Sequence, residues 1–215
     1  MERVARARRV FGAPDVPFVL SIAGPTGVGK STLVRRFAGR WPVYLELHHD
    51  NPFLPHVLSG ARGDVVERSQ RWFLEQAAEF VRGADPSRPA VLDQDPAAVV
   101  HVYAAEFLRQ GRLDRAAYDR LRRDLAEIRS LFHSWAGGHR VVVLTAPPET
   151  LIDRVARRTR AESRTDRVKA PTGWIEALCD SFESFARRAR APTVSTGDGD
   201  PDAVYAEVTR LLGIA

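Results

Sequence analysis

The sequence predicts an α/β fold in which a five-stranded parallel sheet is covered by helices on both faces, forming a three-layer sandwich. Two observations support this prediction. Short apolar runs alternate with longer amphipathic segments, and a glycine-rich turn joins the first run to the first amphipathic segment. Strands that are separated by helices pair in parallel, because the chain must cross back over the sheet between them. A chain of 215 residues is long enough to bury such a core.

The expected strands are short apolar segments, and the expected helices are the amphipathic segments between them. Asp95 and Asp200 each precede a proline, which is the pattern of a helix N-cap followed by proline at the first helical position. The strands are predicted at residues 16–23, 43–47, 90–93, 140–145 and 192–195. The helices are predicted at residues 30–39, 65–82, 96–108 and 115–135, from residue 148 onward, and at residues 174–188 and 201–212.

The domain organisation is expected to be simple, because neither an internal repeat nor a low-complexity linker is evident in the sequence. Residues 1–15 read as a basic N-terminal arm, with an organellar presequence as the alternative, and residues 16–215 as one domain. The helices within about residues 55–135 form an insertion suited to an acceptor pocket. Arginines within about residues 154–168 read as a lid.

Composition narrows the expected partners and location. The chain has no apolar stretch near the roughly 18 residues that span a bilayer, so no membrane partner is expected. Its single cysteine, Cys179, fits a reducing compartment, and we expect a cytoplasmic protein. The net charge is +5, but the arginines cluster instead of alternating with aromatic residues. A local anion site explains that cluster, so no nucleic acid polymer is expected as a partner.

The strongest motif is the glycine-rich turn at residues 24–31, Gly-Pro-Thr-Gly-Val-Gly-Lys-Ser. It matches the pattern Gly-x4-Gly-Lys-Ser and lies between a predicted strand and a predicted helix, which is the context of a phosphate-binding P-loop. Backbone N–H groups and a lysine there bind nucleotide phosphates, while a serine ligates Mg²⁺. The expected cofactors are therefore ATP and Mg²⁺. The expected nucleotide-binding residues are Gly24, Thr26, Gly27, Val28, Gly29, Lys30, Ser31 and Thr32.

The type of P-loop protein follows from motifs that the sequence lacks. With lysine only at positions 30 and 169, the Asn-Lys-x-Asp motif of guanine-specific switches is absent. Residues 58–62 are similar to the Leu-Ser-Gly-Gly-Gln signature of transport ATPases. They precede the third predicted strand, however, and lack the last two residues of that signature. Asp93, at the end of that strand, is the expected second Mg²⁺ ligand beside Ser31. Motor ATPases commonly have a glutamate after this aspartate, whereas this chain has Gln94. These observations favour a kinase.

Several further motifs resemble those of the deoxyribonucleoside kinases. Glu46 lies at the end of the second predicted strand, before its last residue, and is followed at residues 51–54 by Asn-Pro-Phe-Leu. Residues 70–74, Gln-Arg-Trp-Phe-Leu, are similar to the family's glutamine-containing helix, and residues 91–95 occupy the place of its Glu/Asp-Arg-Ser motif. Residues 154–162 are similar to its arginine-rich lid. The resemblance covers most of the chain.

The resemblance implies a role for each matching residue. Glu46 would be the general base, Gln70 would pair with the nucleobase, and Glu162 would contact the sugar. Arg158 and Arg160 would neutralise the transferring phosphoryl group, while Arg154 and Arg158 would bind the nucleotide. The expected catalytic residues are Glu46, Lys30, Arg158 and Arg160, and the expected substrate-binding residues are Glu46, Phe53, Gln70, Asp93 and Glu162.

Two departures from the family pattern leave the acceptor open. Gln94 stands where the family has arginine, and its sugar-contacting tyrosine is missing near residues 56–58, which are His, Val and Leu. The expected function is transfer of the ATP γ-phosphoryl group to a hydroxyl of a nucleoside-like small molecule. One alternative is a kinase of a non-nucleoside such as an antibiotic or natural product, and another is a non-catalytic ATP-binding regulator. A homodimer is left open.

Overall fold

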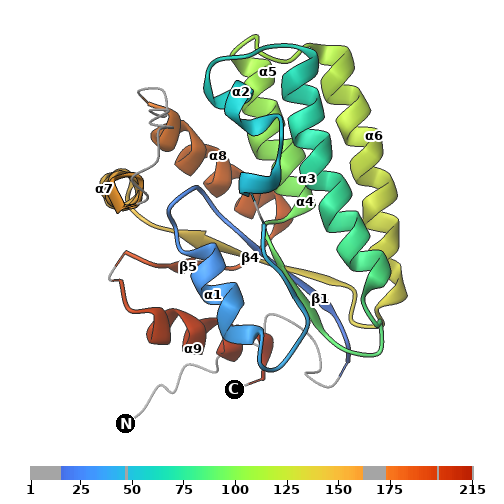
Figure 1. The fold of residues 1–215 in the computed structure, drawn as a ribbon. Coiled ribbons are helices and arrows are strands. Elements are labelled where there is room, and N and C mark those ends of the chain that lie inside the picture. The colour runs from blue at the N-terminus through green and yellow to red at the C-terminus, as the bar shows by residue number, and fades with distance from the viewer. Residues whose placement is uncertain (1–15, 47, 162–172, 198, 215) are drawn as a thin grey trace.

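The structure is a computed structural model that describes residues 16–46, 48–161, 173–197 and 199–214. Its sheet contains five parallel strands in the order β2-β3-β1-β4-β5, so β1 lies at the centre (Figure 1). The fold class predicted from the sequence is confirmed. The strands are β1 (Val19–Ala23), β2 (Val43–Tyr44), β3 (Ala90–Asp93), β4 (His139–Thr145) and β5 (Thr193–Ser195).

The helices follow the predicted alternation with the strands. Before β3 the chain forms α1 (Lys30–Phe37), a 3₁₀ turn (His48–Asp50), α2 (Leu54–Leu58) and α3 (Asp64–Gly83). Between β3 and β4 it forms α4 (Pro96–Ala98), a π-helix (Val99–Ala104), α5 (Ala105–Arg109), α6 (Arg115–Leu131) and a 3₁₀ turn (Phe132–Ser134). The remaining helices are α7 (Pro148–Ala161), α8 (Trp174–Ala189) and α9 (Pro201–Leu212).

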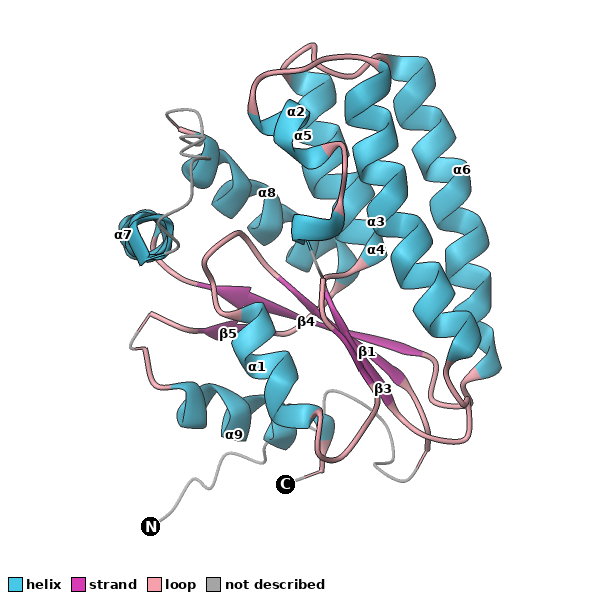
Figure 2. Ribbon diagram, in the orientation of Figure 1, coloured by secondary structure: helices cyan, strands magenta, loops and turns pink. Residues whose placement is uncertain are grey.

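The helices form layers on both faces of the sheet (Figure 2). On one face, α1 and α9 pack in a buried cluster that includes Leu20 and Ile22 of β1. On the other face, Val19 packs with α3 and α6, and Ala23 packs with α8. Successive residues of β1 therefore serve opposite layers, as the period of two along a strand requires.

The sheet brings the candidate site together at its carboxyl edge. Ile22, near the end of β1, pairs with Asp93 at the end of β3. Tyr44, the last residue of β2, pairs with Leu92. Because parallel strands end on the same edge, the glycine-rich turn after β1, Asp93 and Glu46 all lie there.

Several predicted boundaries were wrong by a few residues, and proline explains two of them. The first strand begins at Val19 and not at residue 16, and the fifth begins at Thr193. Pro17 and Pro192 lack an N–H group and cannot donate to the sheet, although the Pro192 carbonyl accepts from Val143 N at 3.0 Å. The second strand ends at Tyr44 and not at residue 47, because this edge strand pairs with β3 over only two residues.

The segment predicted as one helix over residues 96–108 is divided. Asp95 caps it as predicted, since its Oδ1 accepts from Ala97 N at 2.6 Å. A π-helix then spans Val99–Ala104 before regular helix resumes. A π turn contains more residues than an α-helical turn, so the 3.6-residue periodicity of an α-helix does not predict it. Such turns are frequent at functional sites.

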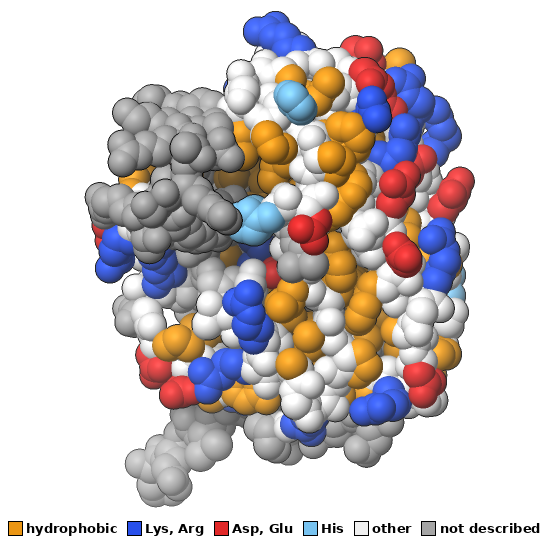
Figure 3. Space-filling model, viewed as in Figure 1, with side chains coloured by type: hydrophobic (Ala, Val, Ile, Leu, Met, Phe, Trp, Pro, Cys, Tyr) orange, Lys and Arg blue, Asp and Glu red, His pale blue; other side chains and the backbone are white. Residues whose placement is uncertain are grey.

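An ion-pair network joins α3 to α6 in the helical part of the fold. Glu67, although only 5% exposed, binds Arg120 of α6 and Arg71 of its own helix, and Arg71 also binds Asp124. Figure 3 shows basic and acidic side chains intermixed along this side of the molecule.

Among the helices that the structure describes, none is long and apolar enough to cross a membrane.

Candidate active site

The glycine-rich turn lies between β1 and α1 and packs tightly against two other elements. A Cβ atom on Gly24, which has a φ of +148°, would lie 2.6 Å from the carbonyl oxygen of Leu144 in β4. A Cβ atom on Gly27, with a φ of +84°, would lie 2.9 Å from Val155 Cγ2 in α7. Only glycine permits both the positive φ and the close approach. The turn therefore has the shape of a phosphate-binding loop, with the start of α1 behind it.

Lys30 extends back over this turn. Its Nζ donates to the carbonyl oxygens of Gly24 at 2.9 Å and Pro25 at 3.2 Å. The ammonium group therefore lies over the loop, where a bound phosphate needs a counter-charge. The other residues predicted to bind nucleotide lie in the loop or the first turn of α1, where Thr26, Gly29 and Thr32 are exposed and Val28 is buried.

Ser31 and Asp93, the predicted metal ligands, lie in contact. Ser31 Oγ donates to Asp93 Oδ2 at 2.5 Å. Asp93 is 1% exposed, and its Oδ1 has no hydrogen-bond partner among the described residues. Burial raises the pKa of this carboxyl above its usual range, and Lys30 opposes the shift. A buried carboxylate oxygen without a partner, beside a serine hydroxyl, fits a Mg²⁺ ion, which prefers oxygen ligands.

Glu46, the predicted general base, lies two residues beyond the end of β2. Its carboxyl group lies near enough to Asp93 and Lys30 for both charges to act on it. Burial, with Asp93 as a smaller contribution, raises the pKa of Glu46 to about 7, and Lys30 acts in the opposite direction. A carboxyl group that titrates near neutral pH is suited to accept a proton from an attacking hydroxyl.

This shift predicts how the activity depends on pH. Glu46 accepts a proton only when it is ionised, and in the free protein it is increasingly protonated as the pH falls below 7. We therefore expect kcat/KM for the acceptor to rise about tenfold per pH unit below the pKa and to level off above it. A pH–rate profile measures this, with Glu46→Gln as the variant that should lose the dependence. A wild-type profile that stays flat across neutral pH would contradict this role.

The loop after β2 is fixed to α3 by Asn51, which is buried. Its Nδ2 donates to both the carbonyl oxygen and the hydroxyl of Ser69 at 3.1 Å, and its Oδ1 accepts from Phe53 N at 3.0 Å. Phe53 also lies under the guanidinium of Arg68, 4.3 Å from its ring centroid. The asparagine of the Asn-Pro-Phe-Leu run thus holds Phe53 against the part of α3 that carries Gln70.

Gln70 follows Ser69 on α3 and is 4% exposed. The structure records no hydrogen bond between its side-chain amide and another described residue. The amide is therefore available to a ligand, and its predicted contact with the base stays a prediction.

The arginines of the expected lid are only partly described. Arg154 donates to Thr196, with Nη1 3.0 Å from Oγ1 and Nη2 2.5 Å from the carbonyl oxygen. Arg157 pairs with Asp153 on the surface of α7. The side chains of Arg158 and Arg160 and all of Glu162 lie outside the described residues, so their predicted roles stay predictions.

Three residues at the site were missed by the sequence analysis or given no structural role. Gln94, noted there only for the residues that it replaces in the motor-ATPase and family patterns, is buried and has a φ of +94°, a backbone conformation that is costly for a residue with a side chain. The hydroxyl of Tyr103, on the π-helix, lies close enough to the Thr26 and Gln94 side chains to interact by hydrogen bonding. Thr196 joins Arg154 to the phosphate loop through Val28. No local sequence signal marks Tyr103 or Thr196, because their partners lie far away along the chain.

Comparison with known proteins finds a family that matches most of the chain. The family model described as deoxynucleoside kinase matches residues 20–210. Among curated proteins, no sequence matches the chain.

Solved structures of a deoxyadenosine kinase from M. mycoides share the fold. The structure with the products dCMP and a flexible dCDP has a TM-score of 0.71 at 16% sequence identity and covers 92% of this chain and 100% of that one. The structure with bound dCTP has a TM-score of 0.69 at 15% identity, with the same coverage. The structure with bound dATP has a TM-score of 0.68 at 17% identity and covers 91% and 99%.

Proposed function

Because the chain belongs to the deoxynucleoside kinase family and is therefore a phosphotransferase that acts on a nucleoside hydroxyl, we propose that ATP is its phosphoryl donor and a deoxynucleoside its acceptor. One observation supports the proposal most. Lys30, Ser31, Asp93 and Glu46 converge at the carboxyl edge of the sheet, with a cation over the phosphate loop and a carboxyl group of raised pKa beside it.

In the proposed reaction, the loop N–H groups and Lys30 hold the β- and γ-phosphates of ATP. Ser31 and Asp93 would hold Mg²⁺, which would draw charge from the phosphate oxygens. The acceptor hydroxyl oxygen attacks the γ-phosphorus while Glu46 takes its proton, and the bond from that phosphorus to the oxygen shared with the β-phosphate breaks. Arg158 and Arg160 are proposed to neutralise charge on the transferring group.

The acceptor is proposed to lie between the loop after β2 and α3. Phe53 and Gln70 come from these two segments, which the Asn51 hydrogen bonds hold together. A glutamine amide offers one donor group and one acceptor, which suits the edge of a nucleobase. Glu162 and Asp93 are proposed to orient the sugar, and Arg154 to contact the nucleotide.

The same proposal includes a cytoplasmic location for the protein, and a homodimer stays a prediction.

A panel of acceptors tests the function. ADP formation would be measured with the common deoxynucleosides and ribonucleosides, and the products identified by mass. We expect at least one deoxynucleoside monophosphate. Gln94 in place of arginine also leads us to expect a narrow range, so efficient turnover of all four deoxynucleosides would contradict that part. A panel without any phosphorylated nucleoside would favour a non-nucleoside acceptor.

Gln70→Ala is expected to change acceptor use more than ATP binding. Loss of a buried hydrogen-bonded partner costs about 1–3 kcal/mol, or roughly 5- to 150-fold in affinity. The acceptor KM should rise by a factor in this range and selectivity among bases should fall, while the KM for ATP stays within about twofold. Gln76→Ala, on the same helix at a partly exposed position, is the matched control. An unchanged acceptor KM in Gln70→Ala would show that Gln70 does not contact the base.

A further inference from the structure

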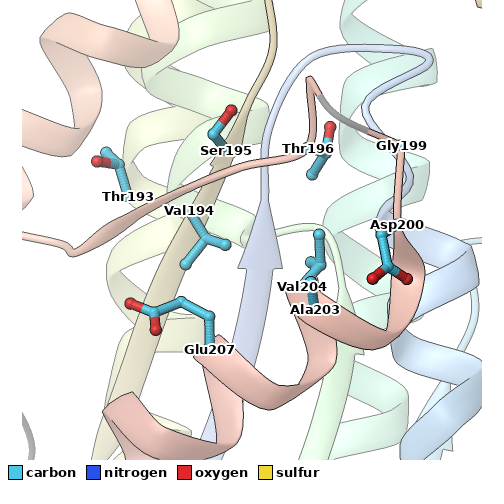
Figure 4. Close-up of a pocket in the computed structure, with 9 residues that line it drawn as sticks. All are labelled: Thr193, Val194, Ser195, Thr196, Gly199, Asp200, Ala203, Val204 and Glu207. Atoms are coloured by element: carbon cyan, nitrogen blue, oxygen red, sulfur yellow. The ribbon is translucent and has the colours of Figure 1, made fainter.

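Thr196 connects the phosphate loop to β4 and to α7. It lies on the loop between β5 and α9 (Figure 4) and is 7% exposed. Its backbone N donates to the carbonyl oxygen of Thr145 at the end of β4 at 2.8 Å. Its Oγ1 donates to the carbonyl oxygen of Val28 at 3.0 Å. Arg154 of α7 donates to both its Oγ1 and its carbonyl oxygen.

The hydrogen bond to Val28 bears on how the loop presents its N–H groups. In a trans peptide unit the C=O and the following N–H point in opposite directions. With the Val28 carbonyl held toward Thr196, the N–H of Gly29 points to the opposite side. An N–H group that is already oriented binds a phosphate more tightly than one that must first be oriented, because less conformational entropy is lost on binding.

The other role of the Thr196 hydroxyl is to accept a hydrogen bond from Arg154. One hydroxyl can donate once and still accept, so a single oxygen joins the phosphate loop to α7. The same helix contacts the loop directly, because Gly27 lies against Leu151 and Val155 so closely that it has no room for a Cβ atom. The loop and α7 are thus connected both by packing and by polar contacts.

We propose that Thr196 is a positioning residue of the donor site, which orients the Val28–Gly29 peptide toward the nucleotide and fixes the loop to α7 through Arg154. The inference rests on the proposed function, in that the bound nucleotide is the phosphoryl donor. Thr196 itself need not touch the nucleotide, since both of its side-chain hydrogen bonds are made to protein groups.

Three variants test the role of the hydroxyl. Thr196→Val keeps the shape of the side chain but removes both hydrogen bonds, and it is expected to weaken binding of the β,γ-imido analogue of ATP by about tenfold in calorimetric titration. Thr196→Ser keeps the hydroxyl and should bind within about twofold of the wild type. Thr209→Val is the control, because Thr209 is also buried but bonds Ala206 of its own helix. It should leave the affinity unchanged.

Two results would overturn the proposal. One is a folded Thr196→Val protein with wild-type affinity for the analogue. The other is a Thr196→Ser protein as weak as Thr196→Val, which would show that packing matters and the hydroxyl does not. The melting temperature of each variant reports whether it is folded.

Arg154→Met gives a second test that does not depend on the folding of Thr196→Val. It removes the guanidinium from the partly exposed end of the network and leaves Thr196 in place. We expect faster hydrogen exchange of the amides of residues 24–31 in the protein without nucleotide. Unchanged exchange of these amides would overturn the connection between α7 and the loop.

Neither experiment requires an acceptor, so the outcomes can be separated from those of the acceptor panel. If Thr196→Val weakens the ATP analogue but no nucleoside is phosphorylated, the proposed acceptor is wrong and the role of Thr196 stands. If a nucleoside is phosphorylated but Thr196→Val binds the analogue as the wild type does, only the role of Thr196 is overturned.

Discussion

Replacing Lys30 by alanine is expected to lower kcat by at least about 10²-fold and to weaken ATP binding about 10- to 100-fold. Its ammonium lies over the phosphate loop, bonded to the carbonyls of Gly24 and Pro25, and it is the charge that would reach the β- and γ-phosphates. The fold should persist, because Lys30 is only partly buried and these bonds lie within its own loop.

The Lys30→Ala result is read from three measurements: the rate of ADP formation, a titration with the ATP analogue, and the circular dichroism melting curve. Arg40→Ala is a suitable control, because it removes an exposed cation that contacts the carbonyl oxygen of Ile214, away from the phosphate loop. Unchanged ATP turnover in folded Lys30→Ala protein would remove the basis for a phosphate site in this loop.

The second large effect is expected at Glu46. Glu46→Gln keeps the size and polarity of the side chain but removes its basic oxygen, so kcat should fall by roughly 10²- to 10⁴-fold. ATP affinity should change little, because a general base that acts on the acceptor hydroxyl does not contact the adenine or the β-phosphate of ATP. The raised pKa of Glu46 and its position beside Asp93 support this role.

A different role for Glu46 would give a different pattern. If its carboxylate organised the Mg²⁺ site with Asp93, high Mg²⁺ would partly restore the rate and nucleotide affinity would fall with kcat. Glu75→Gln, at an exposed position on α3, controls for the loss of a charge near the acceptor side. Near-normal kcat in Glu46→Gln would show that the base lies elsewhere, and Asp93 would be the next candidate.

The central part of the fold could be predicted from the sequence because its signals are local. The apolar runs of β1, β3 and β4 are buried strands, and the Gly-x4-Gly-Lys-Ser pattern lies between β1 and α1 as expected. The two edge strands were predicted too long, because β2 and β5 have one neighbour each and end where pairing ends. Glu46 still reaches the predicted edge, because the chain direction there is set by β2.

The parts of the candidate site that escaped prediction depend on contacts between distant segments. Thr196 and Val28 are 168 positions apart, and only the finished sheet brings β5 and the phosphate loop together. Asn51 could be matched to a family motif, but its hydrogen bonds to Ser69 require α3 to be in place. The π-helix that carries Tyr103 does not follow the periodicity used to predict helices.

The most direct test of the account is to follow the γ-phosphoryl group itself. ATP labelled with ¹⁸O in that group would be incubated with the deoxynucleoside that gives most ADP in the panel, and the products separated by mass spectrometry. The account predicts a labelled deoxynucleoside monophosphate with the wild-type protein and at least about 10²-fold less of it in the same time with Lys30→Ala. Label that appears only in inorganic phosphate, with every nucleoside unchanged, would contradict it.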